Sequence, residues 1–217
     1  MDKQLIDDIF QDIKPKKSDL TKFKIMDAFL ELVEKTDFDH VKVSGIIQKA
    51  GITRSTFYFY FSDIYDLTEY IEDQLISGMP FLPAKNTQIS TIVPRSLPTA
   101  SECLPLGWIQ EWFQYIDRFH YQFKVLLGPH GNPQFRNRVK KFLYSSFQTQ
   151  MDRDGVHHDD LRKHYLDTMT ELQLMLLTRY LQDNGSDCLS IDQIIDILNT
   201  TRVGGLYLSF LEQQTLH

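Results

Sequence analysis

The sequence is poor in cysteine, with only Cys103 and Cys188 in 217 residues. The two thiols are far apart and lack a CxxC spacing, which argues against a zinc or disulfide framework and indicates a reducing compartment. No uninterrupted apolar run approaches the roughly 20 residues that a membrane-spanning helix needs. The first residues carry acid where a secretory signal carries positive charge, so we expect a cytoplasmic protein without a membrane partner.

Positive charge is also scarce, since the formal net charge is −6. Taken alone, this balance argues against a nucleic-acid partner. The charge is unevenly spread, however. Residues 14–64 hold nine basic and seven acidic side chains, whereas residues 65–217 hold thirteen basic and eighteen acidic ones. Only the first of these segments has a positive balance, which is a weak indication of a nucleic-acid surface.

The signatures of common catalytic sites are missing as well. The sequence has no glycine-rich phosphate loop, no nucleophile elbow and no paired-acid pattern. We therefore expect neither an enzyme nor a bound cofactor.

The periodicity of apolar residues predicts an all-α protein. Ser18 or Asp19 is a plausible N-cap for the first helix. Residues 79–105 hold five of the eight prolines, which indicates a long loop. The expected helices cover residues 19–35, 44–50, a short segment from Thr53, 66–78, 107–127, 133–151, 158–184 and 190–213.

The segment GITRSTFYFYF, residues 51–61, contains five consecutive aromatic residues and could be a strand or a helix. No other alternating segment lies nearby to pair with a strand. A helix starting at Thr53 places Phe57 and Phe61 on one buried face and lets the other three aromatics point outward. Gly51 suits a left-handed residue at the end of the preceding helix, and Thr53 offers an N-cap hydroxyl.

Two short helices joined at Gly51 form the outline of a helix-turn-helix. Arg54, Ser55 and Thr56 lie in the first turn of the second helix, where side chains reach base edges. An arginine there can donate two hydrogen bonds to guanine. Hydroxyl groups on this helix can bond phosphate oxygens, and its N-terminus favours phosphate.

The run VKVSGIIQKAGITRSTFYFYFSDIYDL resembles the DNA-binding domain of the TetR family of bacterial transcription regulators, over about residues 20–70. The resemblance implies a three-helix DNA-binding domain followed by a helical bundle that binds a ligand and dimerises. Carried over by position, Arg54, Ser55 and Phe59 are the base readers. The phosphate contacts are Thr53, Thr56, Tyr58 and Tyr60, and the expected DNA contacts also include Lys42 and Ser44.

Three positions depart from the family pattern. Lys42 replaces the usual threonine cap, Tyr60 replaces a histidine, and Ile64 replaces a lysine that grips phosphate. One lost phosphate contact lowers the salt dependence of binding by roughly one unit. The lysines at 14, 16 and 17 could compensate, or they could form a solvated arm. Within the family, the arginine before Ser-Thr looks most like the branch that contains activators of dihydroxyacetone utilisation.

The resemblance divides the chain into a DNA-binding domain at residues 14–64 and a ligand-binding and dimerisation domain at residues 65–217. It implies a homodimer that represses transcription from a palindromic site on double-stranded DNA and responds to a small-molecule effector. An activator, or a protein partner in place of the small molecule, remains open. We expect the last two predicted helices, which are apolar on several faces, to form the dimer.

Aromatic residues of the bundle could line an apolar effector pocket, although aromatics at helical spacing are more often core. The predicted lining is Trp108, Trp112, Tyr115, Phe119, Phe123, Phe142 and Phe147.

Three other interpretations are weighed against simpler ones. Residues 157–160 with His164 could bind a metal, but the run HHDD is better explained as a helix cap. The run RNRVKK at 136–141 is more readily a solvated face than a second DNA site. The chain could also be an all-helical small-molecule binder or an enzyme without DNA binding, using His120 or His164 as acid or base.

Overall fold

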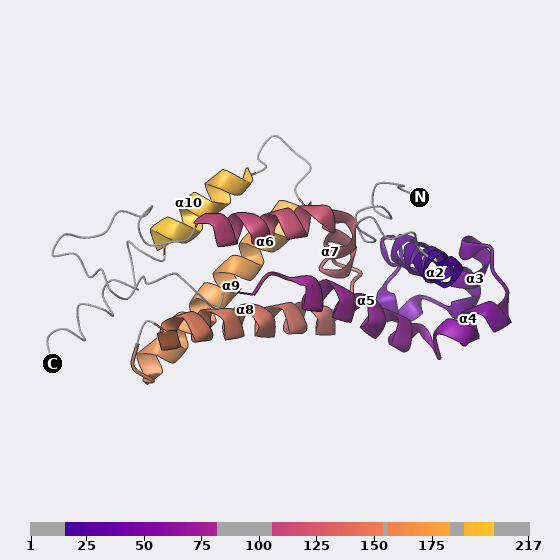
Figure 1. Ribbon diagram of the computed structural model, residues 1–217, viewed down its shortest axis with the longest axis horizontal. Helices are drawn as coiled ribbons and strands as arrows, with labels where there is room; N and C mark the ends of the chain where they lie inside the picture. The colour runs from indigo at the N-terminus through magenta and orange to yellow at the C-terminus, as the bar shows by residue number, and fades with distance from the viewer. Residues whose placement is uncertain (1–15, 82–105, 154–155, 183–188, 202–217) are drawn as a thin grey trace, which may run out of the picture. The chain divides into compact units, whose positions relative to one another are not determined.

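The computed structural model describes residues 16–81, 106–153, 156–182 and 189–201. All regular elements in these ranges are helical, which confirms the predicted all-α class (Figure 1). They are α2 (Lys17–Val33), the 3-10 turn η1 (Phe38–His40), α3 (Val43–Ala50), α4 (Arg54–Tyr60), α5 (Ile64–Gly78), α6 (Leu106–Arg118), α7 (His120–Leu126), α8 (Pro133–Arg153), α9 (Asp160–Gln182) and α10 (Ile191–Thr201).

The chain forms two compact units. Unit 1 comprises Met1–Met79 and Ile116–Asn137, and unit 2 comprises Pro80–Tyr115 and Arg138–His217. Unit 1 therefore contains α7 and the first turn of α8 in addition to the N-terminal helices. The functional boundary after residue 64 is a different kind of division and stays a prediction. Most of the proline-rich segment, residues 82–105, lies outside the described residues.

In unit 1, α2 packs against α3 around a core of fully buried apolar side chains. The two helices meet at Gly45 of α3, where an added Cβ would make ordinary van der Waals contact with Leu32 Cδ1 at 3.4 Å. The Lys49 ammonium also pairs with the Glu31 carboxylate between these two helices. The buried side chains of α2, α3 and α4 that form this core are Ile25, Phe29, Leu30, Val33, Ile46 and Phe57.

The N-terminus of α2 differs from the prediction. The helix begins at Lys17 with Lys16 as its N-cap, so neither Ser18 nor Asp19 is the capping residue. The Asp19 carboxylate instead accepts a hydrogen bond from the Lys16 backbone N–H at 3.0 Å. An acidic side chain at the third helical position can satisfy the N-cap amide in this way.

Segments distant in sequence are joined within unit 1 near His130. Its Nδ1 lies 2.5 Å from Asp37 Oδ1, and its backbone carbonyl accepts from the Phe38 N–H at 2.9 Å. The hydrogen bond from His130 lowers the pKa of Asp37. Asn132 donates to Glu72 at 2.7 Å, which gives this buried carboxylate of α5 a partner. These contacts attach the turn before α8 to η1 and α5.

The sequence predicts one helix over residues 107–127, and this prediction is wrong. The structure ends α6 at Arg118 and starts α7 at His120. Between them, Phe119 takes φ −111° and ψ 28°, outside the helical region. Neither proline nor glycine marks the break, so local sequence rules do not reveal it.

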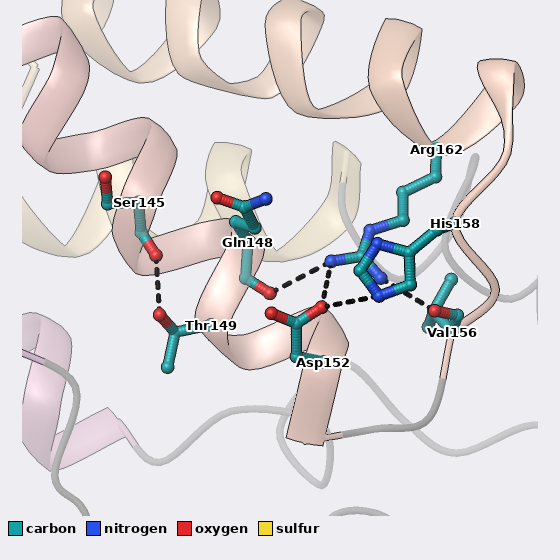
Figure 2. Close-up of polar contacts among 7 residues, drawn as sticks. All are labelled: Ser145, Gln148, Thr149, Asp152, Val156, His158 and Arg162. Atoms are coloured by element: carbon teal, nitrogen blue, oxygen red, sulfur yellow. Dashed lines mark hydrogen bonds and ion pairs between the residues drawn. The ribbon is translucent and has the colours of Figure 1, made fainter.

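The connection from α8 to α9 in unit 2 is organised by a buried arginine. Arg162 is 2% exposed, and its guanidinium donates to the carbonyl oxygens of Val156 at 2.7 Å and Gln148 at 3.2 Å (Figure 2). It also pairs with the Asp152 carboxylate. The Asp159 side chain accepts from the Arg162 backbone N–H at 2.7 Å, which confirms that the HHDD run caps a helix.

Most large apolar side chains of α9 and α10 in the described ranges are buried within the chain itself. Leu174, Leu177 and Leu181 of α9 and Ile194 and Leu198 of α10 are buried. The exposed large apolar residues of α9 are Leu161 and Met175. Residues 202–217, which include part of the predicted dimer surface, lie outside the described residues.

Candidate nucleic-acid interface

The turn between α3 and α4 is built by local backbone chemistry. Gly51 follows α3 in the left-handed conformation, with φ 64° and ψ 38°, which favours glycine. Thr53 then caps α4, because its Oγ1 accepts a hydrogen bond from the Thr56 N–H at 3.2 Å. Both features confirm the predicted helix-turn-helix geometry.

The five aromatic residues of α4 and its C-cap divide as predicted. Phe57 is fully buried and Phe61 is 3% exposed, so both belong to the core of unit 1. Tyr58 is 45% exposed and Phe59 is 79% exposed, while Tyr60 is half-buried. Phe59 is therefore the large apolar side chain of α4 that is most accessible to a partner.

The first turn of α4 presents a cluster of hydroxyl groups beside a cation. Thr53 Oγ1 lies 2.9 Å from Ser55 Oγ and 2.8 Å from Thr56 Oγ1. Arg54 and Ser55 are exposed, and the Arg54 Nη2 donates to the Tyr58 hydroxyl at 3.4 Å. The geometry thus brings most of the predicted DNA contacts together on α4 and its N-cap, whereas Lys42 and Ser44 lie at the start of α3.

A shallow hollow of roughly 480 Å³ lies between the start of α3 and the start of α4. It is lined by Lys42, Val43, Ser44, Ile47, Gln48 and Arg54. The exposed Gln48 is absent from the residues that sequence reasoning selected. No spacing rule identifies it, because Gln48 and Arg54 belong to different helices and share a hollow only in the folded chain.

The structure shows where the basic side chains near the DNA-binding helix lie and where one is replaced. Ile64 is the first residue of α5 and is half-buried, so this site has no cation in the place of the usual lysine. Lys16 and Lys17 are exposed at the start of α2, and Lys14 lies outside the described residues. In the RNRVKK run, Lys140 Nζ pairs with Glu171 Oε1 at 2.5 Å, and Val139 is buried.

The structure distributes the predicted effector-pocket residues over both units. Trp112, Tyr115, Phe142 and Phe147 belong to unit 2, whereas Phe119 and Phe123 belong to unit 1. The Trp108 side chain lies outside the description.

Several of these side chains have core neighbours. Phe123 is fully buried and its ring lies 5.9 Å from the Phe135 ring. Phe147 packs against a buried cluster that includes Met151 and Tyr165. Trp112 is 1% exposed, and its indole Nε1 has no hydrogen-bond partner within the described part of the chain.

The described residues do not assemble the alternative metal site proposed around residues 157–160 and His164. Within the described ranges, no three histidine, cysteine or acidic side chains lie close enough together to hold a metal ion. His158 Nε2 lies 3.2 Å from Asp152 Oδ1, beside the buried Arg162, and His164 is exposed on α9. None of the helices in these ranges has both the length and the apolar character that a bilayer crossing requires.

Comparisons with known proteins agree with the helix-turn-helix. Residues 25–71 match the family described as bacterial regulatory proteins, tetR family. The fold is similar to the crystal structure of a TetR transcriptional regulator from Streptococcus agalactiae 2603V. That similarity has a TM-score of 0.51 at 17% sequence identity, and it covers 85% of this chain and 94% of the other. No curated protein matches the sequence.

Proposed function

Because residues 25–71 match the tetR family of bacterial regulatory proteins, we propose that the chain is a ligand-responsive repressor. It acts as a homodimer on a palindromic operator in double-stranded DNA. Residues 14–64 bind the DNA, and residues 65–217 dimerise and bind the effector. The narrower likeness to activators of dihydroxyacetone utilisation stays a prediction.

The observation that carries the proposal is the exposed surface of α4. Arg54, Ser55 and Phe59 are exposed on a short helix whose opposite face is anchored by the buried Phe57. A helix held from one side and polar at its first turn fits the major groove, where arginine reads guanine. The hollow lined by Lys42 and Gln48 lies beside it and suits the phosphate backbone.

A homodimer supplies two copies of α4, and a two-fold axis relates the half-sites of a palindrome. Met175 and Leu161 are the exposed apolar side chains of α9 that a second copy would cover. An effector changes DNA affinity only if it binds the DNA-competent and incompetent states differently. Trp112, whose buried indole N–H has no partner within the described residues, is the group of unit 2 that we assign to effector binding.

The test is a selection of bound sequences from random double-stranded DNA, followed by affinity titrations at two salt concentrations. We expect a two-fold symmetric sequence whose affinity falls steeply with salt, because counterions leave the phosphates on binding. Arg54→Ala should weaken binding by about 1–3 kcal/mol and relax the preference at one base pair in each half-site.

The competing function is an all-helical small-molecule binder that does not act on DNA. The absence of a lysine at position 64 is the observation that favours it. Such a protein would select no sequence, and its weak DNA affinity would not change with Arg54→Ala. Failure of the selection would therefore remove the repressor function and leave unit 2 as the place to search.

A further inference from the structure

Arg54 is the surface end of a continuous chain of contacts that runs through the core of unit 1. The Tyr58 ring packs edge-on against the buried Phe57, with centroids 5.5 Å apart. Phe57 lies 6.1 Å from Phe61, and Phe61 lies 5.5 Å from Tyr70 of α5. The half-exposed Tyr58 ring therefore rests on one side against Phe57, a side chain that cannot move without disturbing the core.

The Arg54 side chain lies along this held ring. Its guanidinium carbon is 5.5 Å from the Tyr58 ring centroid, and its Nη2 donates to the Tyr58 hydroxyl at 3.4 Å. Cation–π attraction and the long hydrogen bond together favour one family of arginine rotamers. An arginine otherwise loses much rotamer freedom when it binds, so a guanidinium already directed along the helix gains affinity by preorganisation.

Both side chains of the Arg54–Tyr58 pair keep hydrogen-bonding groups that can contact DNA. A guanidinium has five N–H donors, so one bond to Tyr58 leaves four for a base edge. The Tyr58 hydroxyl accepts from Arg54 and therefore keeps its own hydrogen to donate to a phosphate oxygen. A cation that donates to a hydroxyl polarises it and strengthens its outgoing hydrogen bond.

We propose that Tyr58 is a positioning residue for sequence readout, which orients Arg54 toward its base while its hydroxyl donates to the neighbouring phosphate. Base recognition and backbone contact are then coupled through one hydrogen bond. The inference rests on the proposed DNA-binding function and adds a specificity role to a residue otherwise assigned only to phosphate.

A double-mutant cycle on the operator selected with the wild-type chain tests this role. The variants are Tyr58→Phe, which keeps the ring and removes the hydroxyl, Arg54→Ala, and the combination. Affinities are measured on the operator and on a version with the Arg54-read base pair changed, at several salt concentrations. We expect Tyr58→Phe to reduce discrimination at that base pair by about three- to tenfold, the size of one hydrogen bond. In the Arg54→Ala background the same change should leave discrimination unaltered.

Tyr60→Phe is the matched control, because it removes a hydroxyl from the same helix at a residue whose ring packs on Phe59. It should weaken binding by a similar factor on every sequence and leave both base discrimination and the salt dependence unchanged, because a neutral hydroxyl displaces no counterion from a phosphate. Thermal melts confirm that each variant is folded.

Two results would overturn the coupling. One is a Tyr58→Phe effect that is equal on all sequences and adds to that of Arg54→Ala. The other is an Arg54 side chain whose NMR order parameter at Nε is the same with tyrosine and phenylalanine at position 58. A wild-type chain that selects no sequence would instead refute the DNA-binding function itself, and the positioning role with it.

Discussion

The two helix connections α3–α4 and α8–α9 are fixed by different kinds of interaction. The first relies on residues inside the turn, the left-handed Gly51 and the cap Thr53. The second relies on Arg162, a buried side chain that reaches the carbonyl oxygens of Val156 and Gln148. A turn held by its own backbone leaves the neighbouring side chains available for a partner. A turn held by a buried cation consumes its polar groups internally.

The largest effect is expected from removing that cation. Arg162→Ala removes the guanidinium donor from the Val156 and Gln148 carbonyl oxygens and leaves His158 as the partner of the Asp152 carboxylate. Unit 2 should therefore lose about 3 kcal/mol of unfolding free energy. Urea titration followed by tryptophan fluorescence measures this, since Trp108 and Trp112 both belong to unit 2. Arg179→Ala removes an exposed arginine of the same helix and should change little. Equal losses in the two variants would show that the buried contacts are not what stabilises this connection.

Gly51→Ala tests the locally held connection. The added methyl group meets nothing within 4 Å, so the whole cost is the left-handed backbone, about 1–2 kcal/mol. Gly45→Ala is the control, because α3 keeps its helical backbone there and the new Cβ makes ordinary contact with Leu32. That variant should be neutral or slightly stabilised. Denaturant unfolding gives the free energy of unfolding of both variants. A Gly51→Ala variant as stable as the wild type would contradict the left-handed conformation of Gly51.

Thr53→Ala should cost somewhat less, about 1 kcal/mol, because the Thr56 N–H loses its acceptor. Thr53→Ser keeps a hydroxyl cap and should remain close to wild type. Amide hydrogen exchange of α4 separates the two variants. If both exchanged at the wild-type rate, the cap would contribute nothing to the helix.

The smallest effect concerns the long-range pair of Asp37 and His130. The pKa of Asp37 is lowered in the folded chain, so the unfolded chain binds more protons around that pKa. The stabilisation is therefore complete above the ordinary pKa of 3.8 and is lost as the pH falls through the lowered value. Melting temperatures measured from pH 5 downward should fall more for wild type than for Asp37→Asn. Asp39→Asn removes an equal charge nearby and should keep the wild-type dependence.

These comparisons explain what the sequence could predict. The cap, the left-handed glycine and the buried Phe57 all depend on spacings of a few residues, which are visible without a fold. The Arg162 contacts and the His130–Asp37 pair join positions that no local rule connects, the latter 93 residues apart in sequence. The α6–α7 break at Phe119 was missed for the same reason, since its non-helical backbone carries no proline or glycine signal.

The candidate site also combines residues that local sequence identifies with residues that only the folded chain brings together. Residues of α4 were predicted because their chemistry and order along one helix match a known recognition pattern. Gln48 could not be predicted, because it lines a hollow together with Arg54 and Lys42, and a hollow exists only once two helices are placed. The effector lining could not be predicted from aromatic spacing, since that spacing also produces the buried contact of Phe123 with Phe135.

The backbone at Gly51 also has a stereochemical consequence. Its φ of 64° and ψ of 38° are close to the mirror image of an ordinary helical residue. An amino acid of inverted chirality prefers these angles. D-alanine placed there by chemical synthesis should therefore stabilise the domain, because it restricts the unfolded chain without straining the folded one. The same methyl group thus destabilises or stabilises this turn according to its handedness alone.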